Sequence, residues 1–325
     1  MAEALFYIGY AADHDVRFKA SSGGVGTAIM HYLLSQPEYG TGLTFVFDSE
    51  SCKYVPKLIH SADDINICGS IYHDIDIIGF IRKHIPEIKG EMVVSCPPCQ
   101  VTGVRQLLNK NGIDCFILSF CCSGQTTIEG TWKYYELLGI DKEEVADMQY
   151  RGNGWPSGIQ IKLKDGTKIF RGNYTEPWVT MHRSRLYRPQ RCLYCKWDTG
   201  RNADIALADP WIKEYMESDK IGNTMFVVFS DKGRGVFEAL TKERIINSVP
   251  TDYNSYAIAQ KPNIQKSLFI DGQKTYLYWL VRLTENTCYR KWATKSQKNM
   301  KKHIFIARCL KRFITLMNLN QRNLK

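Results

Sequence analysis

Short apolar runs alternate with amphipathic segments along most of this chain. Between the runs, apolar residues return every three or four positions, as Val25, Ile29 and Leu33 do, which is typical of a helix packed on one side. Strands that alternate with helices favour an α/β fold with a mixed, largely parallel sheet flanked by helices. The runs expected to form strands are residues 5–10, 43–47, 92–95, 115–120, 203–208 and 226–230.

Other segments extend this prediction. Residues 75–85, 129–138 and 235–240 have helical patterns, and the sequence predicts a β-hairpin over residues 159–170. Beyond residue 253 the pattern is mostly helical, which predicts a helical C-terminal part.

Two cysteine-containing turns follow consecutive predicted strands. Cys96-Pro97-Pro98-Cys99 follows the strand at 92–95, and Cys121-Cys122-Ser123-Gly124 follows the strand at 115–120. A helix between the two strands implies that they are parallel neighbours, so both turns should emerge at the same edge of the sheet. Ligands of open α/β sheets bind outside the carboxyl ends of the strands. We therefore expect Cys99 and Cys122 to share a site.

A Cys-x-x-Cys pair lies further along the chain, in Arg191-Cys192-Leu193-Tyr194-Cys195-Lys196-Trp197-Asp198. Two thiols at this spacing can both face one metal ion or iron-sulfur cluster. Four thiolates are the usual ligand set of such a centre, so the two turns upstream are candidates for the remaining ligands. Several arginines precede the pair, and positive charge beside thiolates lowers their pKa.

A polar, glycine-containing segment, Ser21-Ser22-Gly23-Gly24, immediately precedes the helix expected from Val25. Backbone N–H groups at a helix N-terminus attract anions, and glycines allow a ligand to approach the backbone closely. With Arg17 and Lys19 nearby, the segment is a candidate phosphate-binding site. As a motif it is weak, because serine and glycine before a helix are most often just a helix cap.

Cysteine content and net charge add two expectations. The chain starts without the features of a signal peptide and contains no apolar run of membrane-spanning length, which indicates a cytoplasmic protein. Its eleven cysteines then indicate metal, cluster or thiol chemistry. The net charge of +10 is concentrated from Arg290 onward, where eleven Lys and Arg residues occur without Asp or Glu. The rest of the chain has 32 basic and 33 acidic residues, so it does not indicate nucleic-acid binding.

This charge distribution predicts two parts, a body at residues 1–285 and a basic helical tail at residues 286–325. The tail mixes apolar and basic residues at near-helical spacing, so it is a candidate for contact with a membrane surface or an acidic partner. The sequence pattern slightly favours an ordinary solvated terminal helix over such a contact.

Taken in order, these segments resemble the coenzyme F420 hydrogenase/dehydrogenase beta-subunit family of flavin and iron-sulfur oxidoreductases. The resemblance runs from about Phe6 to Trp211. It rests on Ser21 to Val25, on Pro98-Cys99-Gln100, on Cys122-Ser123-Gly124, and on Arg191 to Trp211, which contains Arg-Cys-x-x-Cys, Ala-Asp-Ile and Asp-x-Trp.

The resemblance implies an enzyme with non-covalent FAD and a nearby 4Fe-4S cluster. Electrons would pass between a ferredoxin or a separate electron-transfer subunit and an organic acceptor, either the deazaflavin coenzyme or another small-molecule substrate. No catalytic acid can be named. The resemblance implies Cys99, Cys122, Cys192 and Cys195 as cluster ligands, and Lys19, Ser21, Ser22, Gly23, Gly24 and Asp209 as flavin contacts.

The chain also departs from the family pattern. Cys96 stands where the family usually has glycine, Ser123 where it has histidine, and Ala208 where it has glycine. The extra thiols of Cys96 and Cys121 leave two ligand positions ambiguous, and motif register favours Cys99 and Cys122. The ferredoxin-like segment that often precedes this domain is also missing.

Two other functions fit parts of the sequence. Cys96 and Cys99 are spaced like the thiol pair of a thiol-disulfide enzyme. Four cysteines could also hold structural zinc in a non-catalytic module that docks to a partner or membrane.

Overall fold

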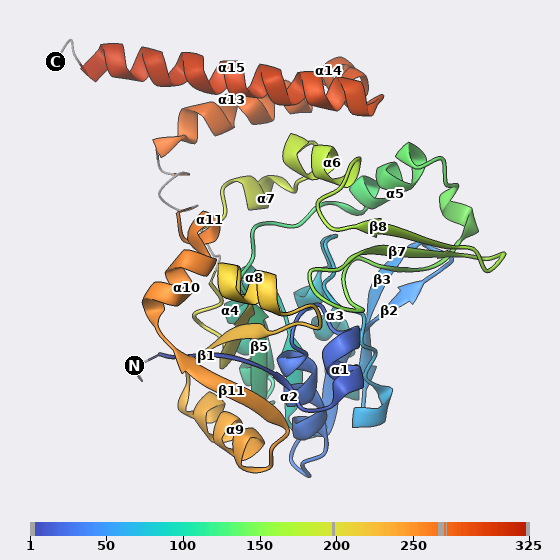
Figure 1. Ribbon diagram of the computed structural model, residues 1–325, viewed down its shortest axis with the longest axis vertical. Helices are drawn as coiled ribbons and strands as arrows, with labels where there is room; N and C mark the ends of the chain where they lie inside the picture. Colours follow the sequence, from blue (N-terminus) through green and yellow to red (C-terminus); the bar gives the residue numbers. More distant parts are fainter. Residues whose placement is uncertain (1–3, 197–198, 266–269, 271, 323–325) are drawn as a thin grey trace.

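The computed structural model describes residues 4–196, 199–265, 270 and 272–322. In these residues eight strands form one mixed sheet, which lies in the lower half of Figure 1. The predicted α/β fold with a mixed, largely parallel sheet is confirmed. In order across the sheet, the strands are β11 (Ile246–Thr251), β1 (Leu5–Ala11), β10 (Thr224–Val228), β9 (Ile205–Ala208), β5 (Cys115–Phe120), β4 (Met92–Ser95), β2 (Thr41–Asp48) and β3 (Lys53–Ile59).

The centre of the sheet, β2-β4-β5-β9, is parallel. The parallel pairing of β4 with β5 was predicted from the helix between them, and it is confirmed. Antiparallel pairs extend the sheet on both sides, and the outer strands β3 and β11 were not predicted. The carboxyl ends of β4, β5 and β9 lie at one edge, so the cysteine turns and Asp209 all follow strands that end there.

Alternation along the strands divides the buried side chains between the two faces of the sheet. Phe116 and Leu118 of β5 belong to the core beneath α2 and α9, whereas Ile117 belongs to the core beneath α3 and α4. Complete burial of each such side chain stabilises the fold by about 1.5–3 kcal/mol. The covering helices are α2 (Val25–Leu34) and α9 (Asp231–Lys242) on one face, α3 (Ile77–His84) and α4 (Pro98–Lys110) on the other, and α10 (Tyr253–Ala259) beside β1 and β10.

A smaller antiparallel sheet lies beside the main one and contains three strands in the described residues. The β7–β8 hairpin was predicted, but β6 was not. Buried aromatic side chains of Tyr134, Tyr150 and Trp178 pack this sheet against α5 and α6. The elements of this region are β6 (Val145–Gln149), β7 (Gly158–Leu163), β8 (Lys168–Gly172), α5 (Ile128–Leu137) and α6 (Trp178–Ser184).

Short helices occupy several connections between these elements. They are α1 (His14–Lys19), α7 (Gln190–Leu193), α8 (Lys213–Ser218), α11 (Lys261–Ile264) and the 3-10 turns Ala62–Asp64, Ile85–Glu87 and Lys142–Glu144.

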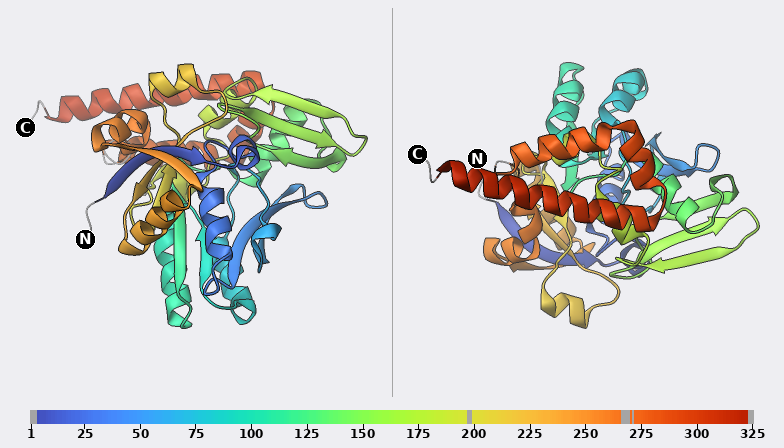
Figure 2. Two further views of the ribbon diagram at one scale, coloured as in Figure 1. Left: turned by 60° about the horizontal axis from the view of Figure 1, so that its bottom comes forward. Right: turned by 90° about the horizontal axis from the view of Figure 1, so that it is seen from above.

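The predicted helical C-terminal part is confirmed, and its helices lie together over α6 at the top of Figure 1. They are α13 (Lys274–Glu285), α14 (Thr287–Thr294) and α15 (Gln297–Arg322). Seen from above in Figure 2, α15 lies uppermost and crosses the molecule. Among the described helices, none is long and apolar enough to cross a membrane. The boundary at residue 285 stays a prediction.

Candidate functional site

A cavity of about 390 Å³ opens at the carboxyl edge of the parallel strands. This volume falls in the usual range of small-molecule and cofactor sites, about 300–1,000 Å³. Four stretches of chain that are far apart in the sequence contribute to its wall. They include residues 20–27, 65–77, 118–125 and 207–211, of which most line the cavity.

The Ser-Ser-Gly-Gly segment forms one wall of this cavity at the N-terminus of α2. Ser21, Ser22 and Gly24 line the cavity. Gly24 is the N-cap residue of α2, and its φ of 76° favours glycine. The N-terminus of this ten-residue helix brings the positive end of a helix dipole to the cavity wall.

Two other predicted flavin contacts are placed differently. A Cβ atom on Gly23 would lie 2.6 Å from the carbonyl oxygen of Gly9 and from the backbone nitrogen of Thr224. Gly23 therefore permits close packing of the segment on β1 and β10 rather than lining the cavity. The Lys19 ammonium lies 3.5 Å from Asp15, and its side chain is 54% exposed outside the cavity wall.

Arg151 and Asp209 also line the cavity, and they form an ion pair in its wall. Arg151 donates from its two terminal nitrogens to the two carboxylate oxygens of Asp209, at 2.7 and 2.8 Å. It also donates to the backbone carbonyl of Ser21 at 2.7 Å, and the Trp155 indole donates to Asp209 at 3.2 Å. Burial alone would lower the pKa of Arg151, but the Asp209 carboxylate keeps this pKa well above its usual range. The pair thus connects the β6–β7 loop to the carboxyl end of β9 and the start of α2.

Sequence reasoning did not identify Arg151 as a site residue. The glycines around it, Gly152 and Gly154, adopt positive φ angles of 135° and 102°, so they shape the loop that carries Arg151 inward. The glycine-rich pattern was a signal for an unusual loop, but the pattern alone did not indicate a partner. The Nε atom of Arg151 is buried and finds no hydrogen-bond partner among the described residues.

The cysteine turns lie beside the same cavity. Cys121 and Cys122 both line it, directly after β5. The stretch from Cys96 to Cys99 was expected to be a turn throughout, but α4 already begins at Pro98, so Cys99 lies in the first turn of that helix. Proline is well tolerated there, since the first helical N–H groups lack partners within the helix.

The thiols of Cys99, Cys192 and Cys195 share one electrostatic neighbourhood. Burial, followed by the nearby thiols of Cys195 and Cys192, raises the pKa of Cys99. Cys192 is in α7, Cys195 follows that helix, and Cys99 comes from the other side of the sheet edge. Trp197 and Asp198 of the same motif lie outside the described residues. The structure thus brings the Cys-x-x-Cys pair close to Cys99.

Arg188 connects this group of thiols to Cys122. Burial, then the neighbouring guanidinium of Arg185, lowers the pKa of Arg188 to about 10, while Cys192 and Cys122 act in the opposite direction. One terminal nitrogen donates to the carbonyl of Ser123 at 3.1 Å. Gly124 has a φ of 111°, which favours glycine in the Cys-x-Gly turn, and a Cβ there would lie 3.2 Å from the Arg188 guanidinium carbon.

The two extra thiols have different surroundings. Cys96 is completely buried in the core between the sheet and α4, and burial raises its pKa far above the usual range. The neighbouring thiols of Cys99 and Cys115 act on the pKa of Cys96 in the same direction. Cys121 accepts a hydrogen bond from the Asn263 side chain at 3.3 Å. Burial therefore argues against Cys96 as a ligand, whereas Cys121 and Cys122 both reach the cavity.

Four cysteine thiols can hold either a single zinc ion or a 4Fe-4S cluster. Within the described part of the chain, no three His, Cys, Asp or Glu side chains lie close enough together to hold a single metal ion. Each iron of a four-iron cluster takes one thiolate, so its four ligands stand farther apart than those of one zinc ion. The four ligands of a 4Fe-4S cluster therefore need not meet at one point.

The protonation of His182 makes the stability of the folded protein depend on pH. Arg188 donates to His182 Nε2 at 3.2 Å, and burial, followed by Arg188, Arg185 and Arg183, lowers the pKa of His182 to about 4. The imidazole is thus neutral in the folded protein. In the unfolded chain it takes up a proton near pH 6.5, about its ordinary value.

We expect the unfolding free energy to fall as the pH is lowered from above about 6.5 toward about 4, because over this range the unfolded state binds more protons. The contribution of His182 is on the order of 1–3 kcal/mol. Urea unfolding at several pH values measures it, and His182→Gln should reduce the slope. An unchanged slope in that variant would show that other groups carry the dependence.

The chain is similar to known proteins both in sequence and in fold. A family model described as coenzyme F420 hydrogenase/dehydrogenase, beta subunit N-term, matches residues 6–81. A second model, for the C terminus of the same beta subunit, matches residues 90–253. No curated protein sequence matches significantly.

Among solved structures, the chain is similar to a chain of the F420-reducing NiFe hydrogenase complex from Methanosarcina barkeri. The two are 15% identical with a TM-score of 0.62, and the match covers 84% of this chain and 90% of that chain. At this identity the structural likeness concerns the fold.

Proposed function

This chain belongs to the coenzyme F420 hydrogenase/dehydrogenase beta-subunit family of oxidoreductases, and from this premise we propose that it holds FAD beside a 4Fe-4S cluster. In this proposal it passes electrons between a ferredoxin-type partner or separate electron-transfer subunit and an organic acceptor. The acceptor is the deazaflavin coenzyme or another small molecule.

One observation carries the proposal. A single cavity is bounded at one wall by the Ser21, Ser22 and Gly24 helix start, and at another by Cys122. The first wall has the chemistry that receives a phosphate group. At the second wall, Cys122 is a neighbour of Arg188, which is also a neighbour of Cys192, and Cys192 in turn lies near Cys99. A phosphate-bearing cofactor in this cavity would therefore lie next to the proposed cluster ligands.

The proposed ligands of the cluster are Cys99, Cys122, Cys192 and Cys195. We propose Ser21, Ser22 and Gly24 as direct flavin contacts, with Asp209, which also lines the cavity, nearby. Gly23 is proposed to hold the wall in place. Lys19 is kept as a weaker proposal, because its ammonium lies near Asp15. When bound, the flavin exchanges electrons in pairs with the acceptor and singly with the cluster.

Residues of this chain would position and shield the cofactors. The Arg151–Asp209 pair fixes the β6–β7 loop against α2, which keeps the cavity wall rigid without adding net charge. Phe45, Tyr72 and Phe120 add aromatic surface to the lining, which suits a planar ring system. Cys99 keeps an exposed surface although its thiol is partly buried near Cys192 and Cys195, and the Arg191 side chain is 54% exposed, so the cysteine side of the site is open to a partner.

A thiol-disulfide function receives less support. The nucleophilic thiol of such enzymes has a lowered pKa. Here burial raises the pKa of both Cys96 and Cys99. Cys96 is also completely buried, so an external disulfide could not reach it.

The proposed function can be tested on protein purified without oxygen. We expect roughly four irons with matching sulfide, since four thiolates suit a 4Fe-4S cluster, together with about one FAD per chain. The visible absorption should bleach on reduction. A colourless protein that holds zinc, or that takes up neither iron nor FAD on reconstitution, would overturn the proposal.

Arg188 should influence the reduction potential of the cluster. Reduction adds negative charge, and the partly buried guanidinium of Arg188 beside Cys192 and Cys122 stabilises the reduced state. Arg188→Gln should therefore lower the potential by roughly 60 mV or more, a tenfold change in a one-electron equilibrium. A redox titration followed by electron paramagnetic resonance measures this shift.

Arg183→Gln is the matched control for Arg188→Gln, since Arg183 is an exposed residue on the neighbouring helix α6. Its potential should remain close to that of the unchanged protein. Equal shifts in both variants would mean that surface charge, and not the partly buried guanidinium of Arg188, sets the potential.

A further inference from the structure

Helix α15 has one face that packs on the protein. His303 is completely buried, and its Nε2 donates to the backbone carbonyl of Ser184 at 3.0 Å. Ala307, Leu310 and Ile314 continue this face against the hydrophobic cluster of α13. The positions 303, 307, 310 and 314 follow helical spacing, so the inner face of α15 is continuous along its packed length.

The opposite face of α15 carries large apolar side chains that nothing in the described structure covers. Phe305 is 67% exposed, and Phe313 and Leu316 are each 62% exposed. Their positions are eight and three residues apart, so they lie on one side of the helix. Large exposed apolar side chains in a contiguous row are uncommon on a protein that makes no contact there.

Basic residues surround this row. Lys298 and Lys302 precede Phe305 on the same side of the helix, and both line a shallow surface hollow together with Phe305. Arg308 and Arg312 flank the row further along, and both are exposed. These four cations form no ion pair with any residue of the described chain. We call the seven residues Lys298, Lys302, Phe305, Arg308, Arg312, Phe313 and Leu316 the outer face of α15.

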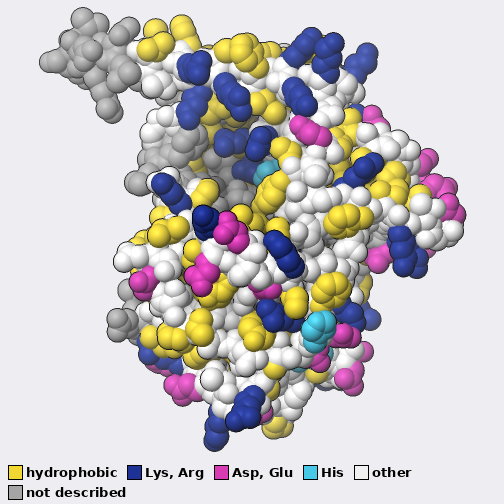
Figure 3. Space-filling view, in the orientation of Figure 1, with side chains coloured by type: hydrophobic (Ala, Val, Ile, Leu, Met, Phe, Trp, Pro, Cys, Tyr) yellow, Lys and Arg dark blue, Asp and Glu magenta, His cyan; other side chains and the backbone are white. Residues whose placement is uncertain are grey.

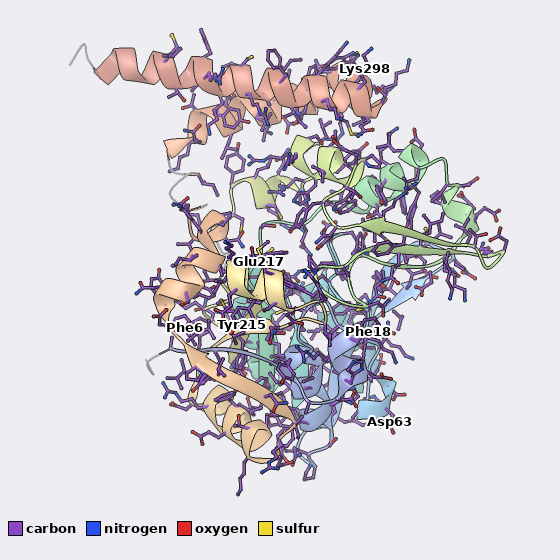
Figure 4. All side chains as sticks on the ribbon, viewed as in Figure 1. Phe6, Phe18, Asp63, Tyr215, Glu217 and Lys298 are labelled. Atoms are coloured by element: carbon purple, nitrogen blue, oxygen red, sulfur yellow. The ribbon has the colours of Figure 1, made fainter. Side chains whose placement is uncertain are left out.

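The outer face is accessible to a broad, flat surface. In Figure 1, α15 forms the upper boundary of the molecule, and Lys298 lies toward one end of it in Figure 4. Figure 3 shows Lys and Arg side chains gathered over one half of α15 and hydrophobic side chains prominent over the other. No Asp or Glu occurs between residues 286 and 325 to oppose a negatively charged surface.

We propose that the outer face of α15 lies on an anionic lipid bilayer. Phe305, Phe313 and Leu316 enter the boundary between headgroups and acyl chains, and the four cations contact lipid phosphates. A second copy of the same face is disfavoured as a partner, because its charges would repel. The helix lies in the plane of the membrane and does not cross it, in agreement with its charge content. This inference does not depend on either cofactor.

The full-length protein with its cofactors can be tested by flotation with lipid vesicles. It should bind vesicles of phosphatidylcholine with about 30% phosphatidylserine, should bind phosphatidylcholine alone much more weakly, and should detach as salt is raised. Lys298→Glu with Lys302→Glu should weaken binding roughly tenfold or more, because two attractions become repulsions. Phe305→Ser with Phe313→Ser should also weaken it, but with no increase in the salt dependence.

Matched controls come from the β7–β8 hairpin. Lys162→Glu with Lys168→Glu reverses two exposed, paired lysines, and Phe170→Ser removes a phenylalanine that is 62% exposed. These variants should bind like the unchanged protein. Circular dichroism checks that each α15 variant keeps its helix content.

Three outcomes would overturn the proposal. The first is absence of binding to anionic vesicles by the unchanged protein. The second is equal loss of binding in the hairpin controls. The third is a salt-sensitive complex with an acidic protein such as ferredoxin, abolished by the α15 variants, without any vesicle binding, since this would assign the outer face to a protein partner.

Discussion

Cys192→Ser protein is expected to purify with almost none of the iron and sulfide found in the unchanged protein. Cys192 is 7% exposed and lies close to Cys99 and Arg188. A serine hydroxyl is a poor ligand for iron in place of a thiolate. Iron and acid-labile sulfide measured on anaerobically purified protein give the result directly, and FAD in the same sample shows whether the flavin cavity survives.

Cys99 and Cys96 provide a paired test of the ligand assignment. Cys99→Ser should lose the cluster in the same way as Cys192→Ser, because these thiols share one neighbourhood. Cys96→Ser should keep its iron, although a hydroxyl in a fully buried apolar site will lower stability. Retention of iron by Cys99→Ser with loss in Cys96→Ser would reverse the assignment.

Cys121 and Cys122 need the same comparison, because both line the cavity. Cys122 lies under the electrostatic influence of Arg188, which also acts on Cys192. Cys121 instead accepts a hydrogen bond from Asn263. We therefore expect Cys122→Ser to lose iron and Cys121→Ser to retain it. If both variants lose iron, the turn as a whole, and not one ligand, holds the centre.

Local sequence patterns predicted the elements on which the site is built. The three apolar residues of β4, Met92 to Val94, and the helical spacing of Val101, Val104 and Leu108 in α4 identify a strand followed by a helix. Right-handed parallel pairing then follows from chain connectivity, so the common edge for Cys99 and Cys122 was accessible from the sequence. The start of α2 at Val25 was predicted in the same way.

Edge strands and long-range contacts were not accessible. In β11 only Ile246 is buried, and Pro250 interrupts the pattern, so no regular alternation marks the strand. The partner of Asp209 lies 58 residues earlier, on a loop whose path depends on how the small sheet packs. Lys19 was expected near the cofactor because it is close in sequence, but the turn of α1 directs its ammonium toward Asp15.

Asp209→Ala is expected to lower the unfolding free energy by about 3–5 kcal/mol, because it leaves the Arg151 guanidinium buried without its carboxylate. Arg151 is 6% exposed, and two of its hydrogen bonds are to Asp209. FAD content should also fall, because the remaining bond of Arg151 to the Ser21 carbonyl cannot by itself hold the cavity wall. Urea unfolding of proteins matched for flavin and iron content measures the stability change.

Two further variants distinguish a buried pair from surface electrostatics. Glu285→Ala removes the partner of Arg282 in an ion pair whose side chains are 62% and 46% exposed, together with one hydrogen bond from Gln190, and it should cost only about 1 kcal/mol. Arg151→Leu combined with Asp209→Leu removes both buried charges, so it should recover much of the stability that Asp209→Ala loses. FAD binding should not recover with it, because the bond to Ser21 is also gone. Recovery of stability without recovery of FAD would therefore separate the role of the ion pair in folding from its role in holding the cavity wall. A loss in Asp209→Ala no larger than that in Glu285→Ala would instead mean that water or a neighbouring side chain satisfies Arg151, and that the wall does not depend on the pair.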